Sequence, residues 1–189
     1  ENSLPSAVPT ILSLTSTADD GTYKLGDVII VTVAFTEAVT VTGTPQLILE
    51  TGTADAVALY TSGSGNDTLI FTYTVAAGDT SSDLDYSSTT ALALNNGTIV
   101  DADSTSAYLT LATKGAANSL GANKELVIDG VVPTVSSVTA TAADGTYTMD
   151  DQIAITIIFS EAVIVTGTPK LTLETGAADE LVDYNSGSG

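Results

Sequence analysis

The sequence predicts an all-β protein built from antiparallel β-sandwiches in tandem, the second of them incomplete. Three observations predict this class. Residues 132–189 repeat residues 8–65 at a constant offset of 124 positions, with roughly 35 of the 58 aligned residues identical. Short segments rich in Val, Ile, Thr, Tyr and Phe alternate between apolar and polar residues, which is typical of strands. Clusters of Gly, Asp, Asn and Ser separate these segments, and helical periodicity is weak almost everywhere.

The repeat divides the chain into three parts. Residues 1–7 form an N-terminal extension, residues 8–131 a complete repeat, and residues 132–189 the first half of a second repeat. A unit of this length can bury its own core. The half repeat would leave a core face and strand edges open, so either the natural chain continues or a neighbouring subunit supplies the missing strands. The second alternative predicts head-to-tail assembly, because contacts that do not close on themselves propagate.

The strongest strand pattern covers residues 28–36, where the apolar face of the first copy stays apolar in the second. Alternation there and at 69–75 predicts the inward residues Ile29, Val31, Val33, Phe35, Leu69, Phe71 and Tyr73. In chain order, strands are expected at residues 11–17, 28–36, 39–42, 46–50, 54–61, 68–75, 91–94, 108–112 and 125–128. Turn residues separate them at 18–21, 42–45, 62–66, 95–97 and 115–118, and residues 79–90 are expected to form a crossover loop or short helical turn. Eight or nine short strands in such a unit predict a sandwich of immunoglobulin-like type.

The charge of the chain excludes several classes of function. It has 23 acidic residues against four lysines, with no arginine and no histidine, for a net charge of −19. Such a chain lacks the basic surface that nucleic acids require, and an anionic bilayer would repel it. No apolar run approaches the ~18 residues of a membrane-spanning helix. Without His or Cys the usual nucleophilic triads and zinc sites cannot form, so no enzymatic activity is expected.

Several motifs resemble, in order along the chain, a known class of repeat. They are DGTYKLGDVIIVTVAFTEAVTVTGTPQLILETG, YTSGSGNDTLIFTYTVAAGDTSSDLDY, ALALNNGTIVDAD and SLGANKELVIDGVVPTV. They are similar to the tandem immunoglobulin-like repeats of very large bacterial cell-surface and type I-secreted adhesin-like proteins. The resemblance covers everything after the first seven residues. It implies a β-sandwich stalk or adhesive array outside the cell, often stabilised by calcium.

Calcium is the expected metal because hard cations bind carboxylate and carbonyl oxygens, which this chain has in excess. No run matches a contiguous calcium loop, so the ligands must come from separate loops. In an immunoglobulin-like sandwich the first turn and the end of the last strand lie at one pole. Asp19, Asp20 and Asp27 are therefore expected near Asp129, with Glu161 of the second repeat facing them. The alternative is that these residues are turn formers or solvated surface carboxylates.

The predicted function is that of a structural extracellular module in a bacterial adhesin, fibre or surface layer, stabilised by calcium and able to assemble head to tail. Its expected partners are other repeats or identical subunits. The alternative is a domain that itself binds a glycan or host protein through its loops. Substitutions between the two copies scatter over strand faces, as at Ile30/Ala154 and Leu59/Asp183, as much as over loops. A ligand-binding repeat would vary at one pole, so this scatter favours the structural role.

Overall fold

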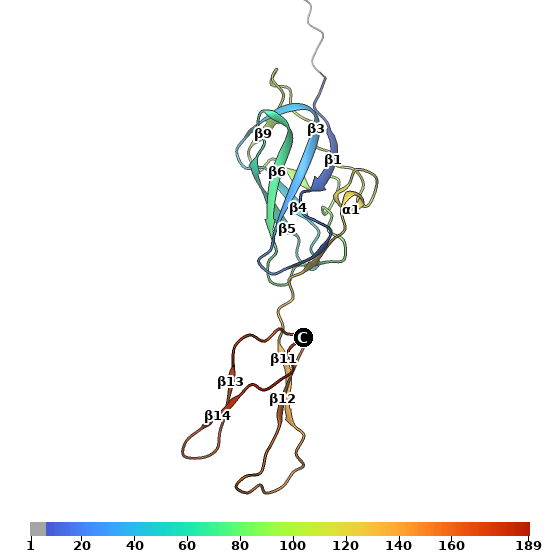
Figure 1. Ribbon diagram of the computed structural model, residues 1–189. Coiled ribbons are helices and arrows are strands. Elements are labelled where there is room, and N and C mark those ends of the chain that lie inside the picture. The colour runs from blue at the N-terminus through green and yellow to red at the C-terminus, as the bar shows by residue number, and fades with distance from the viewer. Residues whose placement is uncertain (1–6) are drawn as a thin grey trace, which may run out of the picture. The chain divides into compact units, whose positions relative to one another are not determined.

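A computed structural model describes residues 7–189, so the predicted N-terminal extension lies outside the described residues except for Ala7. The chain is all-β, with antiparallel sheets of the sandwich class. It divides between Val132 and Pro133 into two compact units, here called unit 1 and unit 2 (Figure 1). No helix within residues 7–189 is long and apolar enough to cross a membrane.

The larger sheet of unit 1 is antiparallel and follows the alternating segments of the sequence. Its strands, in spatial order, are β1 (Ile11–Ser16), β3 (Val28–Thr42), β6 (Asn66–Thr74), β5 (Ala56–Ser62), β4 (Gln46–Leu49) and β8 (Leu92–Ala93). A further strand, β9 (Thr98–Val100), pairs with the far end of β3. β6 lies between β3 and β5, so both of its edges are hydrogen-bonded.

The smaller sheet of unit 1 joins the beginning of the unit to its end. It contains β2 (Gly21–Lys24), β10 (Leu126–Asp129) and β7 (Thr80–Ser81), in the order β2-β10-β7. β2 and β10 are parallel, whereas the other strand pairs of the described residues are antiparallel. The short helix α1 (Leu120–Asn123) precedes β10, and the Ser119 hydroxyl caps it by accepting the Ala122 N–H at 3.1 Å.

The core of unit 1 confirms the inward face predicted from alternation. The seven predicted residues are all at most 2 % exposed: Ile29, Val31, Val33, Phe35, Leu69, Phe71 and Tyr73. Leu84 and Tyr86, which belong to the segment expected to be a loop, are also fully buried. That segment therefore supplies core residues although it contains only the two-residue strand β7.

Other elements differ from the predictions. The expected strands at 28–36 and 39–42 are one strand, β3, with a register shift between Ala34 and Val39. Residues 108–112 form no strand, because Tyr108 makes only a single bridge to Thr10 and is 62 % exposed. β2, β7, β9 and α1 were not predicted, since two to four residues are too few to show a period.

Unit 2 contains two separate two-stranded sheets (Figure 1). One pairs β11 (Val135–Ala140) with β12 (Ile155–Phe159), and the other pairs β13 (Lys170–Leu173) with β14 (Glu180–Asp183). Both registers match those of unit 1 at the offset of 124: Val138 lies opposite Ile157 as Leu14 lies opposite Val33. Every residue from 133 to 189 is exposed or half-buried.

Candidate functional site

Two of the predicted metal ligands lie at opposite ends of the β2–β10 ladder. Gly21 is opposite Leu126 at one end and Lys24 is opposite Asp129 at the other. Three residues of strand separate these ends by roughly 10 Å. Asp20, at the first end, accepts a hydrogen bond from the Glu125 N–H through its Oδ1 atom at 3.1 Å. Asp20 and Asp129 are thus held apart by the strand pairing itself.

A lysine joins the other two acids of this ladder. The backbone N–H of Lys24 donates to Asp27 Oδ2 at 2.7 Å, and its Nζ atom donates to Asp129 Oδ2 at 3.3 Å. The structure therefore brings both carboxylates to the same residue, Asp27 to the backbone N–H of Lys24 and Asp129 to its ammonium group. The lysine side chain is 70 % exposed, so this ion pair adds little stability. Lys24 is replaced by Thr148 in unit 2, where the threonine N–H and hydroxyl contact Asp151.

Asp19 and Glu161 complete the predicted set. Asp19 is exposed, and its carbonyl oxygen accepts a hydrogen bond from the Tyr23 hydroxyl at 2.6 Å. Glu161 is half-buried in unit 2, with its Oε1 atom buried and lacking a hydrogen-bond partner. Among residues 7–189, no group of three or more His, Cys, Asp or Glu side chains is arranged to hold a metal ion. A calcium site that joins Glu161 to the acids of unit 1 stays a prediction.

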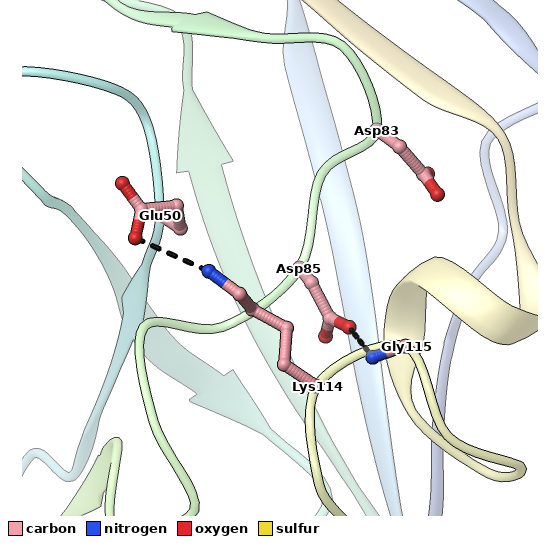
Figure 2. Close-up of a pocket in the computed structure, with 5 residues that line it drawn as sticks. All are labelled: Glu50, Asp83, Asp85, Lys114 and Gly115. Atoms are coloured by element: carbon pink, nitrogen blue, oxygen red, sulfur yellow. Dashed lines mark hydrogen bonds and ion pairs between the residues drawn. The ribbon is translucent and has the colours of Figure 1, made fainter.

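A different acidic cluster lines a hollow of about 260 Å³ in unit 1 (Figure 2). Its lining residues are Glu50, Asp83, Asp85, Lys114 and Gly115. Lys114 Nζ lies 3.3 Å from Glu50 Oε2, and the Gly115 N–H donates to Asp85 Oδ2 at 2.9 Å. Asp85 is 4 % exposed, and its other carboxylate oxygen accepts the Tyr86 N–H. The buried Asp85 carboxylate thus ties the segment after β7 to the loop before α1.

Asp83 lies between this hollow and a second one of about 520 Å³, which Asp20 and Glu125 also line. A β-carbon at Gly121 would lie 3.3 Å from Asp83 Oδ2 and 3.2 Å from Asp85 Oδ2, so both carboxylates approach α1 where that helix has no side chain. Partial burial, followed by the charges of Asp85 and Glu125, raises the pKa of Asp83. This corner of unit 1 therefore concentrates negative charge.

The sequence patterns did not predict this acidic cluster. Its members come from three separate segments: the residue after β4, the segment between β7 and β8, and the loop before α1. The available signal was the alternation of acidic and apolar residues in Asp83-Leu84-Asp85-Tyr86. Pockets for organic ligands are usually apolar with a few polar groups. Hollows lined by carboxylates attract cations instead.

The other candidate surface is the open apolar face of unit 2. Ile157 is 37 % exposed and Val138 is 56 % exposed, whereas the equivalent Val33 and Leu14 of unit 1 are at most 1 % exposed. The same contrast separates Ile153 from Ile29 and Val182 from Ala58. Large exposed apolar patches are uncommon on soluble monomeric proteins. Comparison of the chain with protein-family models, curated proteins and solved structures gave no match.

Proposed function

We propose that this chain is a structural module of an extracellular bacterial surface protein, built from immunoglobulin-like repeats in tandem, and that its task is to carry tension. The observation that supports this role is the contact between the first and last segments of unit 1. These two segments run parallel, since Thr10 bridges Tyr108 and β2 pairs with β10 in parallel register. The chain enters unit 1 at one end of this contact and leaves at the other (Figure 1).

Hydrogen bonds tie the two segments together along their length. Backbone bonds join Tyr108 N to Pro9 O at 2.8 Å, Leu14 N to Asn118 O at 3.0 Å, and Gly21 N to Glu125 O at 3.0 Å. Two side chains add to them. Asn123 Nδ2 donates to Leu14 O and Lys124 Nζ donates to Ala18 O, each at 2.7 Å.

Tension applied through the ends of unit 1 would load these bonds in shear. The two parallel segments are pulled in opposite directions along their common axis, so the bonds between them must break together and not one after another. A unit with this arrangement resists extension, which is what a stalk or fibre requires. The repeat at an offset of 124 residues supports an array in which other repeats are the neighbours.

Extracellular location, adhesion and calcium stabilisation belong to the same proposal. A net charge of −19 opposes a compact fold, so a bound divalent cation or high external salt would stabilise the module. Staining of intact cells of the source organism with an antibody against unit 1 tests its location. Binding of a glycan or host protein is the alternative prediction, and the scatter of substitutions between the two copies over strand faces as much as over loops favours the structural role.

Single-molecule force spectroscopy on the full chain, held at its two ends, tests the mechanical role. Unfolding of unit 1 should appear as one event that releases roughly 40 nm, at about 3.3–3.6 Å per residue. Asn123→Ala removes a side-chain tie between the segments and should lower the rupture force. Lys114→Ala, which lies outside these ties, is the matched control and should leave the force unchanged. Equal rupture forces for all three proteins would contradict a tension-bearing role for this contact.

A further inference from the structure

We propose that the outer face of the larger sheet of unit 1 binds the same face of a second copy of this chain, so that neighbouring modules associate side by side. The inference rests on the structural role proposed above and adds to it the partner of the module. Six neighbouring side chains on the face opposite the core carry it. They are here called the outer patch: Val28, Ile30, Val57, Leu59, Thr72 and Thr74.

The outer patch spans three adjacent strands of the sheet. β6 lies between β3 and β5 (Figure 1), where Thr72 is opposite Ile30 on one side and Leu59 on the other. Val28 and Thr74 form the next outward pair along β3 and β6. All these side chains alternate with buried core residues, so they point away from the core.

The aliphatic members of the outer patch are in contact with solvent. Val28 is 53 %, Val57 is 42 % and Leu59 is 52 % exposed, and Ile30 is half-buried. The solvent-facing side of an antiparallel sheet is usually polar, so a group of aliphatic side chains at this place departs from the common pattern. A partner that covered the outer patch would remove this apolar surface from water, which is favourable.

The second copy of the repeat shows that strand pairing does not require these aliphatic side chains. Leu59 lies opposite Gln46 in unit 1, whereas the equivalent Asp183 lies opposite Lys170 in unit 2 and forms an ion pair with it. The equivalents of the other three aliphatic members are, in chain order, Gln152, Ala154 and Leu181. Only the last of these keeps a large apolar side chain. Contact with a partner accounts for the apolar outer face of unit 1, since the pairing of the strands does not.

The distribution of charge identifies the partner. The outward positions within residues 28–34, 46–48, 57–61 and 68–74 carry no charged side chain, although the chain has a net charge of −19. Copies of such a chain repel one another, and an uncharged face lets them make contact with the least repulsion. In a two-fold contact the same patch meets itself, so a charge near the axis would face a like charge. A cationic partner would be attracted to the acidic parts of the surface instead.

The sizes of the side chains also fit a contact of the outer patch with its own copy. Thr72 on β6 is short, whereas Ile30 and Leu59 on the flanking strands are long. A row of short side chains therefore lies between two rows of longer ones. Two sheets pack face to face about 10 Å apart with their strands within about 30° of each other, and their side chains interdigitate. In this arrangement the long side chains of one copy pack over the threonines of the other.

The threonines of the outer patch can be covered at little cost. The hydroxyls of Thr72 and Thr61 lie 2.7 Å apart and share a hydrogen bond, and the Thr61 hydroxyl also lies 3.2 Å from Leu59 O, to which it donates. Burial of a polar group is expensive chiefly when the group loses its hydrogen-bond partners. These hydroxyls keep theirs within the sheet, so a second copy need not supply any.

The size of the outer patch predicts a weak contact. Three strands about 4.8 Å apart, with outward residues about 6.8 Å apart along each strand, give roughly 200–300 Å² per copy. A standard stable interface buries about 800 Å² per partner. A single contact should therefore have a Kd on the order of 0.1–1 mM. In an array of repeats several such contacts act together, which raises the overall affinity.

Sedimentation equilibrium of the full chain, at concentrations up to about 1 mM, tests the contact. We expect a reversible monomer–dimer equilibrium that strengthens as sodium chloride is added, because salt screens the repulsion between acidic copies. The double variant Gln46→Lys/Leu59→Asp introduces the ion pair of unit 2 without changing the net charge. It should raise the Kd at least about tenfold, because both charges would lose their hydration in the contact. Ile164→Thr, at a residue of unit 2 that is 85 % exposed, is the control and should change the Kd less than about twofold.

Cross-linking locates the contact independently of the double variant. The chain has no cysteine, so Thr72→Cys adds a single thiol at the centre of the outer patch. A short bismaleimide should join two copies through this thiol. Thr40→Cys, at an exposed threonine near the other end of β3, is the matched control and should give no cross-linked dimer above background.

Three outcomes would overturn the proposal. A chain that stays monomeric at about 1 mM in high salt would show that a different partner covers the outer patch. A dimer that Gln46→Lys/Leu59→Asp leaves unchanged, or equal cross-linking through Thr40→Cys, would show that another surface joins the copies. Because the rupture force depends on bonds within unit 1, a monomeric result would leave the tension-bearing proposal standing. Equal rupture forces would in turn leave the dimer unaffected.

Discussion

Replacing Phe35 and Phe159 by alanine, one at a time, compares the same side chain in a covered and an open setting. The two residues occupy equivalent positions, Phe35 opposite Ile11 in β1 and Phe159 opposite Val135 in β11. Phe35 is 2 % exposed, whereas Phe159 is half-buried. The difference between the two losses of stability therefore measures how far the face of unit 2 is covered in solution.

The expected magnitudes follow from buried area. A phenylalanine buries about 150–250 Å², which at about 25 cal/mol per Å² corresponds to about 4–6 kcal/mol. Core Phe→Ala substitutions lower the free energy of unfolding by about 3–5 kcal/mol, and Phe35→Ala should fall in this range. Phe159→Ala should lower the free energy of unfolding of unit 2 by less than about 2 kcal/mol, since that side chain is only half-buried and loses less buried area.

Native-state hydrogen exchange resolves the two units and is the assay of choice. Thermal unfolding followed by circular dichroism supplements it. At roughly 3–6 °C per kcal/mol for a unit of this size, Phe35→Ala should lower the Tm of unit 1 by roughly 10–25 °C. Equal losses at the two positions would show that the face of unit 2 is covered and would refute the reasoning. A loss below about 1 kcal/mol for Phe35→Ala would refute the assignment of the core.

Three further predictions concern charge and hydrogen bonding. The raised pKa of Asp83 means that the folded state binds its proton more tightly than the unfolded state, so the ionised carboxylate opposes folding at neutral pH. Asp83→Asn should therefore raise the Tm at pH 7 more than the charge-matched Asp55→Asn. This gain in Tm should shrink as the pH falls through the pKa of Asp83, and a gain independent of pH would contradict a raised pKa at Asp83. Tyr73→Phe removes the hydroxyl that donates to Asp79 Oδ2 at 2.8 Å and should lower the free energy of unfolding in urea by about 1.5–3 kcal/mol. The control Tyr108→Phe, at a side chain that is 62 % exposed, should have no measurable effect, and equal losses would argue against the Asp79 bond. Millimolar calcium should raise the Tm more than sodium chloride of equal ionic strength, because a bound ion stabilises the folded state by mass action; equal shifts would count against the metal.

Local patterns in the sequence were sufficient to predict the core residues of unit 1 and the division of the chain into repeats. The period of two in residues 28–36 and 69–75 places every second side chain on one face, because this is a property of any strand whatever its neighbours. Ile29, Val33 and Phe71 could therefore be assigned to the core before any pairing was known, and they are fully buried or nearly so. The internal repeat can likewise be recognised from the order of residues alone.

Contacts between segments that are distant in the sequence could not be predicted from such local patterns. β2 and β10 have four residues each and lie more than a hundred positions apart, so neither their pairing nor its parallel direction leaves a local pattern. That pairing holds Asp20 and Asp129 at opposite ends of a ladder, whereas the strand order of an immunoglobulin-like sandwich had predicted that they lie at one pole. The acidic hollow around Asp83 and Asp85 depends on the same kind of contact. The register of long-range strand pairs decides which carboxylates lie close together. That register minimises the free energy of the whole fold, so no short segment of sequence is enough to predict it.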